Sequence, residues 1–597
     1  MKLSDYVVAF LAKRDMQTVF LVSGGGIMHL VDSVGKSSEM RYYCNYHEQA
    51  CAHSAEVYFR VTNKVGVCLV TTGPGGVNAL SGVASAWVDS IPMLVISGQV
   101  RRDLIADYTI LRQKGPQEGN VIEMARPVTK YAVTLLEPQK IRYELEKALH
   151  IATTGRSGPV WLDIPLDIQG AEIDEAALES FSPPQEISMA RSMEEYAAEF
   201  LVTAEGARRP LFLPGNGIRI AKAEDLLSEL LKALPFPVVT PNCAKDLISE
   251  SNPQNMGVFG TAGQRRANFA VQNADCVFFM ASGINATKAG FNYKEFAPRA
   301  KKVIIDIDHG QLHHQVIKPD IAIQADISDF ITEVLRQIRT RTLRLSLSPK
   351  WLKACADWKE CYPIILEEFY QDKDHVNTYV FMDKLSDLLS SQDIIVAGNG
   401  IEAVSYWQAF KVKPAQRTLI SGNWGPMGWD LPAAVGACIG ANHQTICLTG
   451  DGSSQWNAQE MLTIKHYNLP VKIFIFNNRG YTNIRMTQAH FFGRFVGADE
   501  SSGVSNPDFA HLAAAYGFTY SRIETNDQIE EGIKAVLQTA GPALCELNVD
   551  VRQGITPKVS SFRREDGTLE SRALEDMAPF LPREEVWRNM HLFDDKD

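Results

Sequence analysis

The stretch GDGSSQWNAQEMLTIKHYNLPVKIFIFNN (residues 450–478) is the most informative part of the sequence. An acidic residue between two glycines opens it, an amphipathic segment follows, and an apolar run after Leu469-Pro470 ends on Asn477-Asn478. This succession predicts a turn, a helix and a buried strand of an α/β sheet, in which ligands bind where strands turn into loops. A carboxylate at Asp451 and a carboxamide at Asn478 predict an oxygen-rich site of the kind that Mg²⁺ prefers, beside glycines that let the backbone approach phosphates.

The same alternation of apolar runs and helical patterns extends along almost all of the 597 residues. Runs such as VGVCLV, KKVIIDID and DIIVAG are continuous and rich in Val and Ile, which is typical of parallel strands covered by helices on both faces. Polar breaks near 182–192 and 344–350 divide the chain into three blocks of similar size. The sequence therefore predicts three doubly wound parallel-sheet α/β domains and a loop-rich C-terminal tail. The predicted ranges are 1–182, 190–345, 365–550 and, for the tail, 551–597.

Composition argues against several classes of protein. The formal net charge is −11 and no basic block is present, so a nucleic-acid or anionic-membrane surface is not expected. The ten cysteines are scattered and form no CxxC pair, as expected of reduced thiols in a cytoplasmic protein. The N-terminal segment MKLSDYVVAFLAKRD predicts an amphipathic helix rather than a signal peptide, and no apolar run approaches the ~20 residues of a membrane span.

Single motifs of the first block are ambiguous. Gly-rich turns at 23–26, 71–78 and 215–221 follow predicted strands, but none completes the dinucleotide-binding fingerprint, and each alone is more often a tight strand-to-helix turn than a phosphate site. Glu48 precedes a predicted helix, where a carboxylate commonly does no more than favour the helix N-terminus. The order of the motifs is more specific, because HEQ comes first, then TTGPGG, and finally GDG followed by NN.

In this order the motifs resemble those of the thiamine-diphosphate-dependent enzymes, and within them the acetolactate-synthase-like group. The resemblance covers nearly the whole chain, from VFLVSGGG to PFLPREEVWRNM. It implies a pyrimidine-binding, a central and a diphosphate-binding domain, with thiamine diphosphate and Mg²⁺ as cofactors. The reaction that it implies is decarboxylation of a 2-oxo acid, expected to be pyruvate, and carboligation of the acyl unit to a carbonyl acceptor.

The resemblance also implies roles for individual residues. Glu48 is expected to share a proton with the aminopyrimidine ring of the cofactor, while Gln117 and Gly25 face the reacting centre. The implied metal ligands are Asp451, Asn478 and the carbonyl of Gly480. Contacts to thiamine diphosphate are implied for Gly400, Ile401, Gly425, Met427, Gly452, Ser453, Asn478 and Tyr481. For His29 and His47, which lie near these motifs, packing and catalytic roles both stay open.

Partners and a second cofactor follow from the same resemblance. In such enzymes the cofactor lies between two subunits, with Glu48 from one and Asp451 from the other, so a homodimer or homotetramer is expected. Four residues match positions where the central domain of the group holds FAD: Arg156, Gly260, Thr261 and Asp306. Because two arginines of that domain are missing here, the sequence leaves FAD binding open.

Three positions depart from the pattern of acetolactate synthases. Gly283 and Thr287 stand where the group has arginines, one of which recognises the acceptor carboxylate. Thr487 stands where the group has a tryptophan that helps to select the second 2-oxo acid. Because the loss of an arginine fork is not a conservative change, we expect a different acceptor, such as a nucleotide-linked ketosugar.

Polar side chains after the metal loop are expected to face the hydroxyls of that acceptor, namely Asn483, Arg485 and Gln488. Three alternatives stay open. The chain could be an acetolactate synthase proper, or a lyase or hydrolase that cleaves a C–C bond in a 2-oxo acid or a cyclic diketone. It could also be a non-catalytic subunit, although retention of Glu48, Asp451 and Asn478 argues against that.

Overall fold

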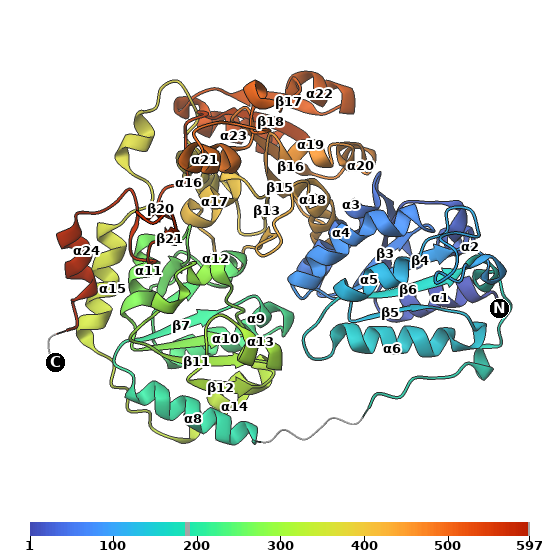
Figure 1. Ribbon diagram of the computed structural model, residues 1–597, viewed down its shortest axis with the longest axis horizontal. Coiled ribbons are helices and arrows are strands. Elements are labelled where there is room, and N and C mark those ends of the chain that lie inside the picture. The colour runs from blue at the N-terminus through green and yellow to red at the C-terminus, as the bar shows by residue number, and fades with distance from the viewer. Residues whose placement is uncertain (185–190, 595–597) are drawn as a thin grey trace.

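The computed structural model describes residues 1–184 and 191–594 and contains three parallel six-stranded sheets with helices on their faces (Figure 1). This arrangement confirms the predicted fold class of three α/β domains. Each sheet lies within one of the predicted domain ranges, and the boundaries of those ranges stay predictions.

The first sheet has the strand order β2-β1-β3-β4-β6-β5. Its strands are β1 (Thr18–Leu21), β2 (Arg41–Cys44), β3 (Gly66–Val70), β4 (Met93–Gln99), β5 (Tyr131–Thr134) and β6 (Val160–Pro165). The helices of this domain are α1 (Leu3–Lys13), α2 (Met28–Lys36), α3 (Glu48–Thr62), α4 (Pro74–Val88), α5 (Val121–Ala125), α6 (Ile141–Thr153) and α7 (Leu166–Gln169). Strands β3 and β4 are buried along their whole length, as their continuous apolar runs predict.

The second sheet has the strand order β12-β11-β10-β7-β8-β9. Its strands are β7 (Pro210–Pro214), β8 (Val238–Thr240), β9 (Asn255–Val258), β10 (Cys276–Met280), β11 (Lys301–Asp306) and β12 (Ile321–Gln324). The helices are α8 (Met193–Gly206), α9 (Gly217–Ile220), α10 (Glu224–Ala233), α11 (Arg265–Asn273), α12 (Ala286–Ala289), α13 (His309–His314) and α14 (Ile327–Thr340). Helix α15 (Pro349–Cys361) then leads toward the third sheet.

The third sheet has the strand order β14-β13-β15-β16-β18-β17. Its strands are β13 (Ile394–Ala397), β14 (Thr418–Ile420), β15 (Thr445–Gly450), β16 (Val471–Asn477), β17 (Thr519–Ile523) and β18 (Ala543–Asn548). The helices are α16 (Thr378–Leu388), α17 (Ile401–Ala409), α18 (Asp430–Ala441), α19 (Ser453–Trp456), α20 (Glu460–His466), α21 (Thr482–Phe491), α22 (Phe509–Tyr516) and α23 (Ile529–Gln538). Strands β15 and β16 pair in parallel, with Gly450 opposite Phe476, so the turns after both strands lie at the same edge.

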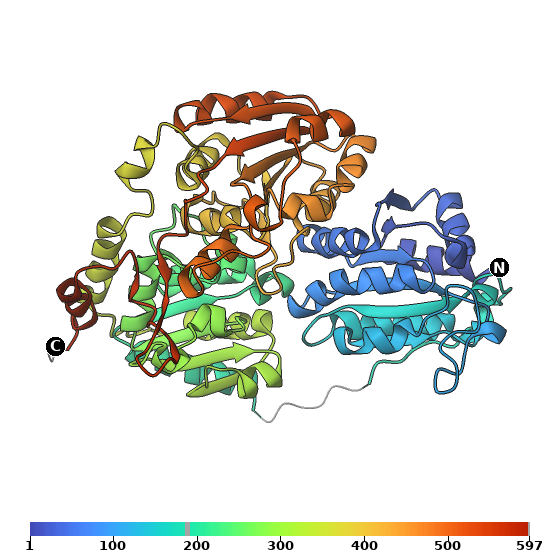
Figure 2. The ribbon, with the colours of Figure 1, turned by 45° about the horizontal axis from the view of Figure 1, so that its top comes forward.

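The tail after the third sheet crosses to the central domain (Figure 2). It forms two small antiparallel sheets, from β19 (Lys558–Val559) with β22 (Met577–Ala578) and from β20 (Ser561–Arg563) with β21 (Leu569–Ser571), and helix α24 (Arg583–Met590). Asn268 of α11 donates to the carbonyl of Leu574 at 2.9 Å, and the ring of Phe593 lies 5.8 Å from that of Trp351. The tail therefore completes the apolar core of the central domain.

Helix α3 of the first domain packs directly on α18 of the third (Figure 1). One apolar core joins the two domains, with Cys51 and Ala55 of α3 in the same cluster as Ala433 and Ala437 of α18. A Cβ at Gly436 would clash with the carbonyl oxygen of Ser54, so the two helix backbones approach as closely as a glycine allows.

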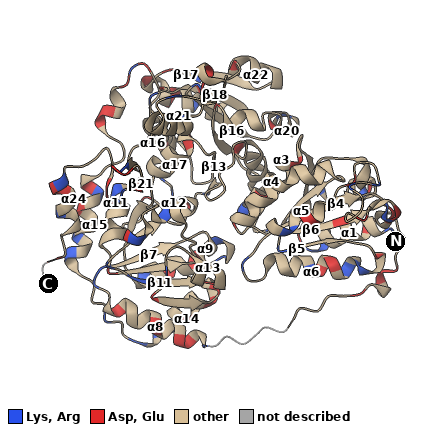
Figure 3. Cartoon of the chain, viewed as in Figure 1, with Lys and Arg blue, Asp and Glu red and all other residues tan. Residues whose placement is uncertain are grey.

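Charged side chains of both signs are distributed over all three domains (Figure 3). This distribution agrees with the absence of a basic block in the sequence. In the part of the chain that the structure describes, no helix combines the length and apolar character needed to cross a membrane.

Candidate functional site

The edge where β15 and β16 end brings Asp451, Asn478 and Gly480 together. Asp451 is 1% exposed, and its Oδ2 accepts hydrogen bonds from the Gly480 N–H at 2.8 Å and from Asn506 Nδ2 at 2.7 Å. Its Oδ1 accepts from the Gly452 N–H at 2.7 Å. Burial nevertheless raises the pKa of Asp451 to about 6, since desolvation of the carboxylate outweighs these bonds.

Arg485, on α21, holds the loop after β16 in place. Its Nη2 donates to the carbonyl of Asn478 at 2.9 Å and to Asn478 Oδ1 at 3.2 Å, and its Nη1 donates to the carbonyl of Arg479 at 3.1 Å. Gln488 likewise exchanges two hydrogen bonds with the backbone of Val496. The expectation that these two side chains face acceptor hydroxyls is therefore wrong, because both bind the backbone of their own segment.

Two loops of the third domain close around Gly452. A Cβ at Gly452 would clash with the ring of Tyr481 and lie 3.3 Å from Met427 Cε, so only glycine fits between these side chains. Ser453 Oγ accepts from the Gly428 N–H at 2.8 Å, which joins the loop of Met427 to the start of α19. The structure thus groups the residues expected at the thiazolium and diphosphate side of the cofactor.

The first turn of α17 contains a buried carboxylate that the sequence interpretation missed. Glu402 is 1% exposed, and its Oε1 accepts from the Gly400 N–H at 2.7 Å. Burial raises its pKa to about 7. The N–H of Gly400, expected to face phosphate oxygens, is donated to Glu402 in this structure.

The start of α3 carries Glu48 and faces the third domain. Glu48 Oε2 accepts from Asn78 Nδ2 at 3.0 Å. The next residue, Gln49, accepts from Asn457 Nδ2 at 3.3 Å, and the same nitrogen donates to the carbonyl of Gly428 at 2.7 Å. Within one chain, the helix of Glu48 therefore contacts the loop that carries Met427.

The neighbouring histidines have structural contacts. His47 is the N-cap of α3, where its Nδ1 accepts from the Gln49 N–H at 3.1 Å. His29 lies beside Gly170, since a Cβ there would be 3.0 Å from His29 Nε2. Both side chains thus lie against other parts of the first domain.

Three segments of the first domain meet near Gly25 and Gln117. The Gly26 N–H donates to Thr71 Oγ1 at 3.2 Å, which joins the first Gly-rich turn to the second. A Cβ at Gly73 would clash with the carbonyl of Gln117, whose own φ is +59°. The two turns and the loop of Gln117 thus contact one another.

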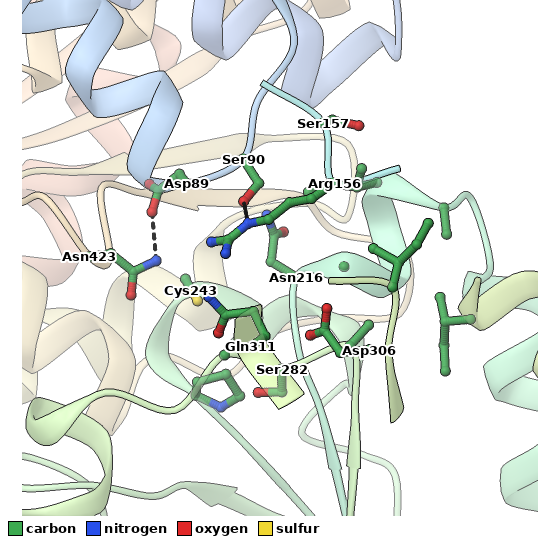
Figure 4. Close-up of a pocket in the computed structure, with 18 of the residues that line it drawn as sticks. Asp89, Ser90, Arg156, Ser157, Asn216, Cys243, Ser282, Asp306, Gln311 and Asn423 are labelled. Carbon is green, nitrogen blue, oxygen red and sulfur yellow. Dashed lines mark hydrogen bonds between the residues drawn. The ribbon is translucent and has the colours of Figure 1, made fainter. Parts of the chain in front are cut away.

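The residues expected to hold FAD are divided between two cavities where the central domain meets its neighbours. Arg156 and Asp306 line the first cavity, of about 350 Å³, while Gly260 and Thr261 line the second, of about 310 Å³. Lys288 and Asn423 line both. In the first cavity, Arg156 donates to Ser90 Oγ at 2.9 Å (Figure 4). Arg156 also donates to Asp308 Oδ2 at 2.9 Å.

Comparisons with known proteins show similarity along most of the chain. Three models match, described as the thiamine pyrophosphate enzyme N-terminal TPP binding domain (residues 1–124), central domain (195–334) and C-terminal TPP binding domain (398–547). The acetolactate synthase large subunit of Cyanidium caldarium is 30% identical over 566 residues, covering 93% of this chain and 94% of the relative.

Two further relatives give the same result. The probable acetolactate synthase large subunit of Methanocaldococcus jannaschii is 30% identical over 570 residues, or 93% of each chain. The acetolactate synthase isozyme 1 large subunit of Escherichia coli K12 is 27% identical over 561 residues, covering 93% of this chain and 95% of the relative.

Proposed function

Because the chain belongs to the thiamine pyrophosphate enzymes and, within them, to the acetolactate-synthase-like group, we propose that it transfers the acyl unit of pyruvate to a carbonyl acceptor other than pyruvate. The membership makes it a transferase and decarboxylase that depends on thiamine diphosphate and acts on a 2-oxo acid. Pyruvate as the donor, Mg²⁺ as the metal and the nature of the acceptor are parts of the proposal.

The residues at the edge of the third sheet fit a diphosphate held through a divalent cation. Asp451, Asn478 and the carbonyl of Gly480 offer three oxygen ligands of the type that Mg²⁺ takes. At Gly452 the ring of Tyr481 occupies the place of a side chain, and a glycine lets the backbone approach phosphate oxygens closely. With a pKa of about 6, Asp451 is mostly ionised at neutral pH and able to bind the cation.

Glu48 is the proposed proton carrier. When bound, thiamine diphosphate supplies the carbanion-stabilising chemistry. Asn78 orients the Glu48 carboxylate through Oε2, which leaves Oε1 next to Gly75. In the proposal, Glu48 holds and releases the proton at N1′ of the aminopyrimidine ring, while the surface around Gly25 and Gln117 positions the donor and excludes water.

The acceptor is proposed from what the central domain lacks. A second 2-oxo acid is recognised most economically by an arginine fork on its carboxylate, and Gly283 and Thr287 cannot supply one. Thr487 is exposed and donates to the carbonyl of Asn483, so no bulky apolar group replaces the expected tryptophan there. These observations argue against a second 2-oxo acid, and the acceptor in the proposal is a polyhydroxylated carbonyl compound, such as a nucleotide-linked ketosugar.

Acetolactate synthase proper is the second candidate, favoured by the names of the relatives. Formation of acetolactate from pyruvate alone separates the two, and we expect it to be slow. Labelled pyruvate with a panel of carbonyl compounds should give faster mixed products, detected by mass spectrometry. A steady-state rate of acetolactate formation near the enzyme median of about 10 s⁻¹ would restore acetolactate synthase.

Three further parts of the proposal concern the state of the protein. A homodimer or homotetramer with Glu48 and Asp451 from different subunits follows from the resemblance to the group. FAD is proposed in the first cavity, which Arg156 and Asp306 line, and the visible absorbance of the purified protein tests it. The scattered cysteines, of which Cys44 and Cys361 are exposed, agree with a cytoplasmic enzyme.

A further inference from the structure

Lys288 of the central domain is a buried cation that lines both of the cavities described above. It lies on α12 and is 7% exposed. Its Nζ donates to the carbonyl of Gly283 and to Asn423 Oδ1, each at 3.1 Å. Both acceptors are neutral, and none of the ion pairs found in residues 1–184 and 191–594 includes Lys288.

One residue, Asn423, separates the carboxylate of Asp89 from Lys288. Asn423 Nδ2 donates to Asp89 Oδ1 at 2.7 Å, as the dashed line in Figure 4 shows, so Asn423 stands between Asp89 and Lys288. Burial raises the pKa of Asp89, and the positive charges of Arg60 and Lys288 both oppose that rise. Burying an ammonium group is costly unless an anion contacts it directly. Among the described residues, no carboxylate contacts Lys288.

The second cavity is the side on which an anion fits. Among the described residues that line it, Lys288 is the one charged group, whereas the first cavity is also lined by Arg156 and by three carboxylates, those of Asp89, Asp306 and Asp326. Its remaining polar groups are neutral, among them Asn242, Thr261 and Ser421. An anion entering the second cavity therefore meets a positive charge and no opposing carboxylate.

This cavity also borders the proposed reacting centre. It is lined by Gly398 and Asn399, directly before Gly400, and by Gly425, two residues before Met427. The opposite wall comes from the loop 258–262 of the central domain. A molecule in this cavity therefore lies between the loops assigned to the cofactor and the ammonium of Lys288.

We propose that the second cavity is the acceptor site and that Lys288 binds a phosphate group of the acceptor within it. A lysine is a point charge suited to phosphate, whereas a carboxylate is best matched by the planar fork of an arginine. The positive charge of the site is thus supplied one position after Thr287, and its chemistry favours a phosphorylated acceptor over a 2-oxo acid. This inference rests on the proposed carboligation.

The test measures binding of matched probes to protein loaded with thiamine diphosphate and Mg²⁺. Dihydroxyacetone phosphate, dihydroxyacetone and 2-oxobutyrate share a small carbonyl skeleton but differ in charged group. We expect wild type to bind the phosphate about 10- to 100-fold more tightly than the neutral probe, the worth of a hydrogen bond to a charged group. Lys288→Met should remove this preference, and Lys288→Arg should retain part of it.

Lys294→Met, at an exposed lysine of the same domain, is the matched control and should bind like wild type. Should Lys288→Met fail to fold, Lys288→Arg carries the comparison, because it should shift the preference toward 2-oxobutyrate. Equal binding of the three probes by wild type, or an unchanged preference in Lys288→Met, would overturn the inference. Release of CO₂ from pyruvate by wild type, measured separately, tests the proposed function itself.

Discussion

Glu48 and Asp451 are single carboxylates whose positions the motifs predict and whose surroundings the structure supplies. Asn78 orients the first, and three N–H donors from Gly480, Gly452 and Asn506 surround the second. The sequence could not predict these partners, since they come from distant segments. At the scale of single residues, the proposed roles of these carboxylates depend on which groups donate hydrogen bonds to them.

Glu48→Gln should leave binding of thiamine diphosphate nearly intact and lower turnover by at least about 10²-fold, the usual scale for a proton-transfer residue. Glutamine keeps the size and the bond from Asn78 but cannot carry the proton. Exchange of the C2 proton of the bound cofactor, followed by NMR, should slow in parallel. Unchanged exchange would remove Glu48 from this role.

Glu402 predicts a pH dependence of stability. Its pKa is raised from 4.5 to about 7 in the folded protein, so the folded state binds a proton more tightly than the unfolded state. This contribution is fully present below pH 4.5 and is lost as the pH rises to about 7, on the order of 3 kcal/mol.

Glu402→Gln should flatten that part of the curve, because its neutral amide still accepts from the Gly400 N–H. Melting temperatures of wild type and Glu402→Gln are measured without cofactor across this pH range. The difference between the two curves gives the contribution of Glu402, because the other titrating groups are common to both proteins. Parallel curves would show that Glu402 keeps an ordinary pKa.

Residues that act through burial were the hardest to predict. Lys288 and Glu402 stand in short segments where nothing in the local pattern reveals that their charges are enclosed, because burial depends on tertiary packing. Arg485 was expected to face the acceptor, but the carbonyls of the loop after β16 need donors and take its guanidinium.

At the scale of elements, the packing of α3 on α18 joins the two domains that carry the proposed cofactor residues. The sequence predicted a helix after Glu48, yet it could not predict the contact of that helix with α18, since a small residue on each helix is compatible with many partners. Gly436 against Ser54 shows what the contact requires, namely two backbones without a side chain between them.

Gly436→Ala should destabilise the protein by about 1–3 kcal/mol, the usual cost of inserting a methyl group into a packed interface. Gly35→Ala in α2 is the matched control, because its Cβ would meet nothing within 4 Å and should stabilise the helix slightly. Melting temperatures of the two variants should therefore move in opposite directions. A Gly436→Ala protein as stable as wild type would contradict the close approach of these helices.

At the scale of the molecule, the three parallel sheets were predictable because each strand is a continuous apolar run between helices. The arrangement of subunits could not be predicted in the same way, since one chain contains both halves of the proposed site. Gln49 contacts Asn457 within this chain, whereas the resemblance to the group assigns the two halves to different subunits.

Mixing two inactive variants decides between these arrangements. Glu48→Gln and Asp451→Ala should each be nearly inactive alone, but a shared site lets their mixed dimer form one intact centre. After subunit exchange at equal concentrations, activity should recover to about a quarter of wild type, since half of the dimers are mixed and each has one of two centres. Mixtures that stay inactive although exchange is complete would place the whole site in one chain.

The crossing of the tail has a consequence for synthesis on the ribosome. Leu574 and Phe593 complete a core whose other members, such as Phe269 and Trp351, are translated before the whole third sheet. At about 5–20 residues per second, the nascent central domain waits roughly tens of seconds with that apolar surface uncovered. A ribosome that stalls within the third domain would leave this surface exposed to chaperones and proteases.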